Sequence, residues 1–146
     1  MTILKCCVID DEPLASQLIA SYVEKTPFLQ LVGVYSSAQE AVKVIIENQV
    51  DVVFLDIEMP QLNGMEFAKI IPATTRIIFT TAYDQYAIQG FKVNALDYLL
   101  KPINYDEFLN AVNKALQWFD AQNNRASQTP SNDYIIVKSE YRLVQI

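Results

Sequence analysis

The feature of this sequence that most constrains its fold is a repeated alternation between short apolar segments and amphipathic ones. The apolar segments are rich in Val, Ile, Leu and Phe and cover residues 3–9, 29–35, 50–55, 76–80 and 95–100. Strands that are apolar throughout are typical of parallel sheets, which carry helices on both faces. Parallel neighbours also need a long crossover between them, usually a helix. The sequence therefore predicts an α/β domain made of five strand–helix units.

The segments between the strands carry helix start signals. Pro13 suits the first turn of a helix, where its missing N–H group is not needed. Ser37 and Glu40 have the spacing of a capping box, and Asn104 with Glu107 opens the last helix. The two remaining helices are predicted over residues 65–71, before Pro72, and over residues 84–92.

Composition excludes several classes of protein. Of the residues, 51% are hydrophobic and 19% are charged, so a full-sized core can be buried. No apolar run approaches the ~20 residues of a membrane span, and residues 1–10 lack the basic region and cleavage site of a secretory signal. Cys6 and Cys7 are neighbours in a predicted strand, so their side chains point to opposite faces, which favours core packing over a disulfide. These features indicate a cytoplasmic protein with no membrane segment.

Charge and histidine content narrow the possible functions further. Residues 1–124 carry 8 basic and 15 acidic side chains, a net charge of −7, whereas residues 125–146 carry a net charge of +1. A domain this acidic is a poor direct ligand for nucleic acid, because protein affinity for nucleic acid depends largely on neutralised phosphates. The chain has no histidine, which excludes imidazole catalysis, histidine triads and most zinc sites.

The C-terminal part of the sequence differs from the rest. Residues 123–133 are rich in Asn, Ser, Gln, Thr and Pro, which is typical of a linker. Residues 134–137 and 141–146 then alternate like the two strands of a hairpin. Because a lone hairpin cannot bury enough surface to be stable, we expect residues 134–146 to be the first part of a second domain.

Side chains suited to chemistry stand at the ends of four predicted strands. In an open α/β sheet, ligands bind outside the carboxyl ends of the strands, where the strand order switches. Those ends carry three carboxylates, two hydroxyls and one amine: Asp10, Asp11, Asp56, Thr80, Thr81 and Lys101. Taken singly, an aspartate can serve a helix N-terminus or a turn, and a lysine can simply be solvated. Their convergence at one edge of the sheet favours a shared function.

This set of groups suits phosphoryl transfer. Clustered carboxylates repel one another unless a cation joins them, and Mg²⁺ prefers carboxylate, water and phosphate oxygens. One carboxylate can then attack phosphorus to form an aspartyl-phosphate. The lysine and the metal would offset charge on the transferred group, and a threonine hydroxyl would bond another of its oxygens. The residues thus predict a Mg²⁺-dependent phosphoryl acceptor.

Four short motifs resemble the receiver domains of two-component response regulators. They are Val-Ile-Asp-Asp-Glu-Pro at residues 8–13, Asp-Ile-Glu-Met-Pro at 56–60 with Asn63-Gly64, Thr81-Ala82, and Lys101-Pro102. The resemblance covers a receiver domain at residues 1–122. Residues 79–87 and 94–102 are similar to the LytTR (LytR/AlgR-type) branch, and residues 134–146 resemble the opening of a LytTR DNA-binding domain.

The resemblance implies a fold and a metal site. The fold would be flavodoxin-like (CheY-like), a doubly wound five-stranded parallel sheet of order 2-1-3-4-5 with five helices. Asp56 would accept the phosphoryl group from a sensor histidine kinase. Asp11 and Asp56 would be direct Mg²⁺ ligands, Asp10 would act mostly through water, and the backbone carbonyl of Glu58 would be the third protein ligand.

The resemblance also implies a switch and partners. Thr81, rather than Thr80, matches the phosphate-sensing hydroxyl, Tyr98 matches the switch aromatic and Lys101 the phosphate-binding lysine. The bond between Lys101 and Pro102 would be cis. The protein would be a phosphoacceptor with at most slow self-dephosphorylation, not an enzyme. It would form a homodimer on activation and bind DNA through a C-terminal domain beyond residue 146.

Two other functions compete with this interpretation. A haloacid-dehalogenase-type phosphatase also uses an aspartyl-phosphate, Mg²⁺, a threonine and a lysine, but its second aspartate stands two residues after the nucleophile. Here that position, after Asp56, is Glu58. A nucleotide- or flavin-binding module would need a glycine-rich phosphate loop, and Gly33, Gly64 and Gly90 do not build one.

Overall fold

The computed structural model describes residues 2–57, 67, 69–82 and 95–128. The chain divides into two compact units, Met1–Ala115 and Leu116–Ile146. Residue 58 and the predicted helix over 84–92 lie outside the described residues. Of the predicted helix over 65–71, residues 67, 69, 70 and 71 are described, and the first three of these are helical. Among the described residues, no helix has the length and apolar character needed to cross a membrane.

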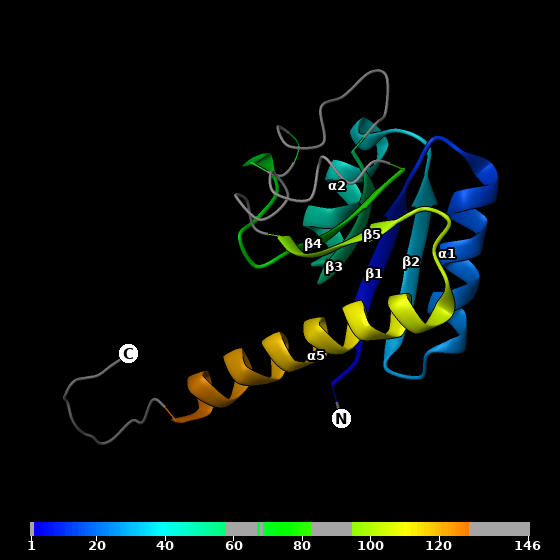
Figure 1. Ribbon diagram of the computed structural model, residues 1–146. Coiled ribbons are helices and arrows are strands. Elements are labelled where there is room, and N and C mark those ends of the chain that lie inside the picture. Colours follow the sequence, from blue (N-terminus) through cyan, green and yellow to red (C-terminus); the bar gives the residue numbers. More distant parts are fainter. Residues whose placement is uncertain (1, 58–66, 68, 83–94, 129–146) are drawn as a thin grey trace. The chain divides into compact units, whose positions relative to one another are not determined.

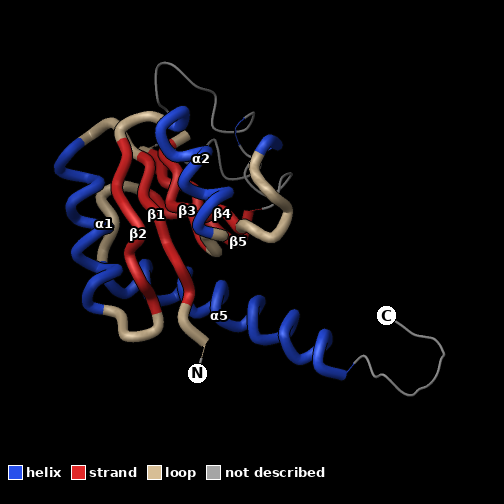
Figure 2. Tube along the Cα trace, turned by 180° about the vertical axis from the view of Figure 1, so that it is seen from behind, coloured by secondary structure: helices blue, strands red, loops and turns tan. Residues whose placement is uncertain are grey.

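The first unit is built on a five-stranded parallel sheet (Figures 1 and 2). Its strands lie in the order β2-β1-β3-β4-β5, and every neighbouring pair is parallel, which confirms the predicted fold class and strand order. The strands lie within two residues of their predicted limits and are β1 (Leu4–Ile9), β2 (Leu29–Tyr35), β3 (Val52–Asp56), β4 (Arg76–Thr81) and β5 (Ala95–Leu100).

Three described helices begin at their predicted start signals. They are α1 (Pro13–Lys25), α2 (Ala38–Asn48) and α5 (Tyr105–Gln128). The Ser37 hydroxyl accepts a hydrogen bond from the Glu40 N–H group, and Asn104 Oδ1 accepts one from the Glu107 N–H group at 2.8 Å. Both caps satisfy N–H groups that have no partner inside the helix.

Helix α5 is longer than the sequence pattern indicated. It runs to Gln128 and so includes residues 123–128, which were predicted to belong to a linker. Ala, Gln and Arg in this stretch are good helix formers, and the first proline after it is Pro130. The predicted hairpin at residues 134–146 lies outside the described residues, so the limits of a second domain remain a prediction.

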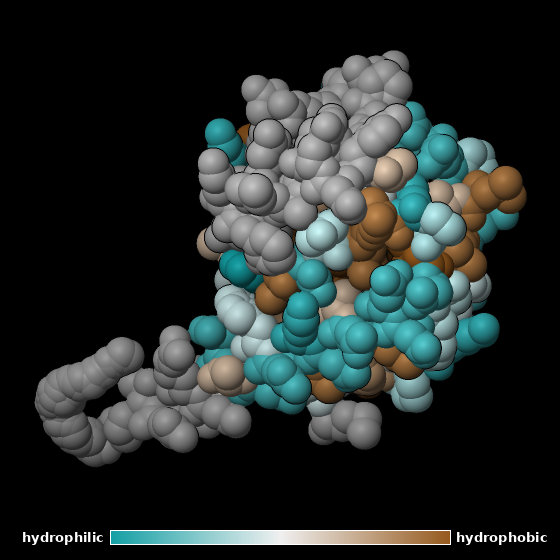
Figure 3. Space-filling model, in the orientation of Figure 1, coloured by the Kyte–Doolittle hydropathy of each residue, from teal (hydrophilic) through white to brown (hydrophobic). Residues whose placement is uncertain are grey.

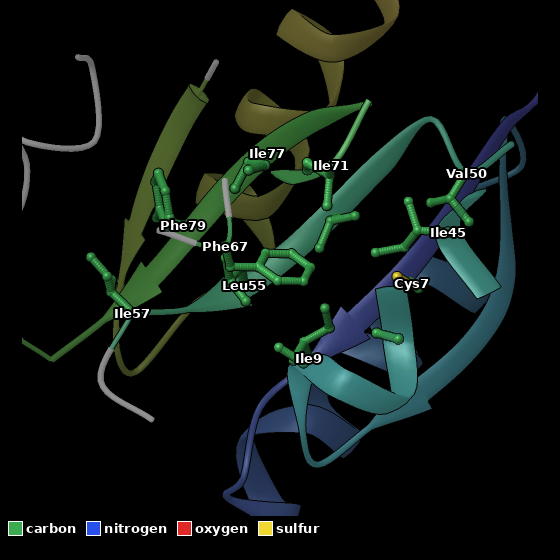
Figure 4. Close-up of a cluster of buried hydrophobic side chains, with 13 residues drawn as sticks. Cys7, Ile9, Ile45, Val50, Leu55, Ile57, Phe67, Ile71, Ile77 and Phe79 are labelled. Carbon is green, nitrogen blue, oxygen red and sulfur yellow. The ribbon is translucent and has the colours of Figure 1, made fainter. Parts of the chain in front are cut away.

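One face of the sheet packs against α2 through a continuous hydrophobic cluster (Figure 4). Alternate residues of the inner strands, including Cys7, Leu55 and Phe79, contribute to it, and Ile45 comes from α2. These side chains are fully buried. Residues two apart on a strand share a face, so the side chains of Cys6 and of the even-numbered residues of β3 point to the other face.

The opposite face of the sheet is covered by α1 and by the N-terminal part of α5. Phe54 of β3 stacks on Phe108 of α5 with ring centroids 5.3 Å apart, and Tyr22 of α1 also lies 5.3 Å from Phe108. The Tyr22 hydroxyl donates a hydrogen bond to the Ile103 carbonyl at 3.0 Å. This aromatic contact therefore ties both helices and the β5–α5 connection to the sheet.

Phe108→Ala tests the importance of this contact for stability. Phe108 is fully buried, so its truncation should lower the free energy of unfolding by about 3–5 kcal/mol. Urea denaturation followed by circular dichroism measures the loss. Ile46→Ala on α2, where the side chain is 53% exposed, is the control and should change stability by less than about 1 kcal/mol. Equal losses in the two variants would contradict the described packing.

Candidate functional site

Three carboxylates meet at the carboxyl ends of two adjacent strands. Asp56 is the last residue of β3, and Asp10 and Asp11 directly follow β1, which pairs with β3 in parallel. One carboxylate oxygen from each of the three lies within 4.8 Å of the others. Asp10 and Asp56 are buried at 3% and 2% exposure, whereas Asp11 is exposed. The cluster therefore opens to solvent on the side of Asp11.

Backbone hydrogen bonds set the position of Asp10. Its N–H group donates to the Tyr35 carbonyl at 3.0 Å, continuing the ladder between β1 and β2. Its Oδ1 accepts a hydrogen bond from the Glu12 N–H group at 2.9 Å. These two contacts direct the other oxygen, Oδ2, toward Lys101.

The Lys101 ammonium contacts three carboxylates at once. Its Nζ lies 2.6 Å from Glu12 Oε1, 3.0 Å from Asp10 Oδ2 and 3.4 Å from Asp56 Oδ2. The Lys101 N–H group donates to the Thr81 carbonyl at 2.7 Å, and the following bond to Pro102 is cis. Only 14% of the lysine side chain is exposed, so the ammonium depends on these carboxylates for its hydrogen bonds.

Burial and neighbouring charges shift the pKa values of these groups. Burial raises the pKa of Asp10 to about 6, although the Glu12 N–H group and Lys101 act in the opposite direction. Burial alone would lower the pKa of Lys101, but hydrogen bonds to Glu12 and Asp10 and the charge of Asp56 raise it above its usual range. The site thus holds a firmly protonated lysine beside a carboxylate that is costly to ionise without further positive charge.

The two threonines lie at the end of β4, beside Asp56. Thr80 pairs with Asp56 in the sheet, and its carbonyl accepts a hydrogen bond from the Ile57 N–H group. Both threonines are buried. The Thr80 hydroxyl has no hydrogen-bond partner in the described part of the chain. The arrangement brings both hydroxyl-bearing residues to the predicted edge.

The structure brings most, but not all, of the predicted site residues together. Four of them, Asp10, Asp11, Asp56 and Lys101, are brought together, with Thr80 and Thr81 on the neighbouring strand end. Tyr98 of β5 pairs with Phe79 of β4, is partly buried, and packs against the hydrophobic cluster on the α2 face. Glu58 lies outside the described residues.

Sequence reasoning assigned no role to Glu12, which nevertheless makes the shortest contact with Lys101. The available signal was its position as the third acidic residue in the run Asp10-Asp11-Glu12, directly before the helix proline. Its side chain is 64% exposed, so it stands at the solvent side of the site. The lysine also lowers the pKa of the Glu12 carboxyl through their hydrogen bond.

A pocket of about 680 Å³ lies next to the carboxylates, between the start of α1 and the β5–α5 connection. It is lined by polar residues, such as Asp11 and Lys101, and by apolar ones, including Leu14 and Ile103. Leu14 is 84% exposed. Figure 3 shows hydrophobic residues exposed among hydrophilic ones on the face of the molecule seen in that view. The acidic site is therefore reached from a partly apolar surface.

The carboxylate cluster fits a divalent cation. The three aspartates offer oxygen ligands close enough to share one ion, and the exposed side of the cluster leaves room for water. Such an ion would also offset the repulsion that accompanies ionisation of Asp10 next to Asp56. Oxygen-only ligation suits Mg²⁺ better than zinc, which prefers nitrogen and sulfur ligands.

A five-stranded parallel sheet of this order, with an acidic cluster and a lysine at its carboxyl edge, defines the class of phosphorelay receiver domains. The family model described as the response regulator receiver domain matches residues 6–113. The chain belongs to this family, as the sequence motifs predicted, and is the receiver domain of a two-component response regulator.

Relatives and solved structures agree with this membership. The chain is 36% identical to an uncharacterized response regulatory protein of Vibrio cholerae over 97% of the chain and 60% of that protein. It is 39% identical to the sensory transduction protein LytT of Bacillus anthracis, over 76% of the chain and 46% of that protein. It is also 39% identical to the transcriptional regulatory protein BtsR of Escherichia coli, over 69% of the chain and 43% of that protein.

The chain spans about half the length of the curated relatives it matches. Among solved structures, the response regulatory domain of mrkE from Klebsiella pneumoniae aligns with a TM-score of 0.73 and 29% identity, covering 82% of this chain and 100% of that domain. A receiver domain protein from Clostridium thermocellum aligns with a TM-score of 0.72 and 30% identity, covering 82% of this chain and 99% of that one. Similarity to LytT and BtsR agrees with the predicted LytTR branch.

Because the pKa of Asp10 is raised, ionisation of this carboxyl should lower the free energy of unfolding of the metal-free chain as the pH rises. Because its folded-state pKa of about 6 exceeds the unfolded value, the contribution of Asp10 to stability is full below about pH 4 and is lost as the pH rises through about 6. Asp10→Asn keeps an oxygen acceptor for the Glu12 N–H group. It should raise the free energy of unfolding by roughly 1–3 kcal/mol at about pH 8, and by little at about pH 4.

Urea denaturation in the presence of a chelator measures this difference. Asp106→Asn, at an exposed position in the first turn of α5, is the control and should show no comparable gain at either pH. An equal gain for Asp10→Asn at both pH values would contradict the assignment of the cost to ionisation of Asp10.

Proposed function

We propose that Asp56 accepts a phosphoryl group in a Mg²⁺-dependent reaction and that the chain acts as a switch rather than as an enzyme. The observation that supports this most directly is the convergence of two further carboxylates and the Lys101 ammonium on Asp56. A carboxylate at that position is a nucleophile with a cation site on one side and a fixed ammonium on the other. Membership of the receiver family agrees with this role.

Different residues of the site carry out different parts of the proposed reaction. A carboxylate oxygen of Asp56 attacks phosphorus, and the bond from phosphorus to the donor breaks, with its electron pair leaving on the donor group. Lys101 Nζ, 3.4 Å from Asp56 Oδ2, is placed to donate a hydrogen bond to a phosphoryl oxygen. Mg²⁺ would be held directly by Asp11, Asp56 and the Glu58 carbonyl, with Asp10 acting mostly through water. It would neutralise charge on the carboxylates and on the transferred group.

Phosphorylation at Asp56 is tested with acetyl phosphate. In the presence of Mg²⁺, mass spectrometry of the intact chain should show one added phosphoryl group, and a chelator should abolish it. Asp56→Asn should remove the label, because an amide is a far weaker nucleophile than a carboxylate. Asp106→Asn is the matched control and should be labelled like the unmodified chain, since its exposed side chain lies in the first turn of α5.

Two results would count against this function. Full labelling of the Asp56→Asn variant would remove Asp56 from the reaction. Repeated turnover of a phosphomonoester would favour the phosphatase alternative, because a receiver accepts one phosphoryl group per chain and releases it slowly.

The switch that we propose runs from Thr81 to Tyr98. A phosphoryl oxygen beside Asp56 would draw the Thr81 hydroxyl toward it and free space that the Tyr98 ring can enter. Tyr98 is partly buried against the hydrophobic cluster, so it can become more or less buried without leaving β5. The surface of β5 and the N-terminal half of α5, where Lys114 Nζ lies 2.9 Å from Asp97 Oδ2, would then change and form the dimer interface. The predicted helix over residues 84–92, which lies outside the described residues, would belong to the same surface.

Tyr98→Ala tests this switch. The variant should still be phosphorylated at the rate of the unmodified chain, but its phosphorylation-dependent dimer should dissociate roughly tenfold more readily, because an aromatic side chain is lost near the interface. Analytical ultracentrifugation with and without acetyl phosphate measures the dimer. Tyr98→Phe keeps the ring and should dimerise nearly normally. Unchanged dimerisation of Tyr98→Ala would remove Tyr98 from the mechanism.

The partners that we propose follow from the family and the charge of the chain. A sensor histidine kinase would supply the phosphoryl group in the cytoplasm. DNA would be bound by a C-terminal domain beyond residue 146, since residues 1–124 carry a net charge of −7 and are unsuited to it. Dimerisation would raise the effective concentration of two such domains on neighbouring half-sites.

A further inference from the structure

The shortest contact of the Lys101 ammonium is with Glu12, which lies outside the aspartate cluster. The distance to Glu12 Oε1 is 2.6 Å, compared with 3.4 Å to the proposed acceptor Asp56. An ammonium has three N–H donors, and here three carboxylates lie around it. A phosphoryl group on Asp56 would add three further oxygens, so Lys101 would have to give up one of its present partners.

Burial decides which partner is easiest to give up. The side chains of Asp10 and Asp56 are 1% and 3% exposed, so water cannot readily take the place of the ammonium beside either carboxylate. The Glu12 side chain is 64% exposed, and water can replace the lysine there at little cost. Glu12 is therefore the exchangeable partner of Lys101.

The backbone of Glu12 is fixed although its side chain is exposed. Its N–H group donates to Asp10 Oδ1 at 2.9 Å, and its carbonyl accepts from the Ser16 N–H group at 3.0 Å. Glu12 occupies the N-cap position of α1, where Ser, Thr, Asp and Asn are favoured, and its side chain makes no capping hydrogen bond. Glu12 is therefore poorly suited to capping the helix, yet it binds the lysine of the site. This combination indicates a role in function rather than in helix stability.

We propose that Glu12 is a positioning residue that holds Lys101 at the mouth of the site before phosphorylation and competes with the phosphoryl group for its ammonium. The inference rests on the proposed function of Asp56. In this proposal, the exposed Glu12 side chain controls how readily Lys101 moves to the transferred phosphoryl group. Removal of the Glu12 charge should therefore make the lysine more available.

Glu12→Gln tests the proposal because it keeps the size of the side chain and removes its charge. Acetyl phosphate with Mg²⁺ should phosphorylate this variant roughly 2- to 5-fold faster than the unmodified chain, the range expected for loss of a partly exposed ion pair. Beryllofluoride, which mimics the phosphoryl group, should bind more tightly by a similar factor in isothermal titration calorimetry. Glu24→Gln, at an exposed position on the same helix, should change neither quantity.

The same substitution in a Lys101→Met background separates competition from a general charge effect. If Glu12 acts through the lysine, Glu12→Gln has no effect on phosphorylation rate or beryllofluoride affinity in that background. An equal gain in both backgrounds, or no gain in the chain with Lys101, would overturn the proposal. Absence of any label on Asp56 in the unmodified chain would instead refute the proposed function, so the two failures are distinguishable.

Discussion

The structure of the site depends on one ammonium group held among carboxylates that are excluded from water. Moving a carboxylate out of water costs several kcal/mol unless a cation or hydrogen bonds compensate. Asp10 and Asp56 are almost fully buried, and Lys101 contacts both. Two hydrogen bonds fix the β5–α5 connection that carries the lysine. The Lys101 N–H group donates to the Thr81 carbonyl, and the Tyr22 hydroxyl donates to the Ile103 carbonyl. The aromatic contact between α1 and α5 therefore also positions the charge at the sheet edge.

The parts of the structure that could be predicted from sequence are those set by periodicity and local chemistry. Strands buried on both faces have uninterrupted apolar sequences, so the five strands and the parallel type of sheet could be predicted. Caps such as Ser37 and Asn104 are local signals, and both form as predicted. The strand order and the roles of the site residues required resemblance to a family, because which strand lies beside which is decided by long-range packing. The carboxylates at adjacent strand ends then meet as a consequence of topology.

Other features escaped sequence reasoning for physical reasons. The end of α5 could not be read because Asn, Gln and Ser are only mildly unfavourable in a helix, and the change in composition at residue 123 resembled a linker. The contact of Glu12 with Lys101 joins residues 89 positions apart, and no local pattern encodes it. The choice between Thr80 and Thr81 rested on resemblance alone, since adjacent residues on a strand differ only in the face they occupy. Both are buried, so burial does not separate them.

The two adjacent thiols on β1 have a consequence for redox chemistry. Cys6 and Cys7 are fully buried on opposite faces of a strand that is paired on both sides. Burial raises the pKa of Cys7 to about 12 and that of Cys6 above its usual range, so neither forms the reactive thiolate in the folded chain. An oxidant or alkylating reagent therefore reaches them only when the sheet opens as a whole. The folded sheet thus shields both thiols from the redox balance of their surroundings, and the rate at which a thiol reagent modifies them measures how often the sheet opens.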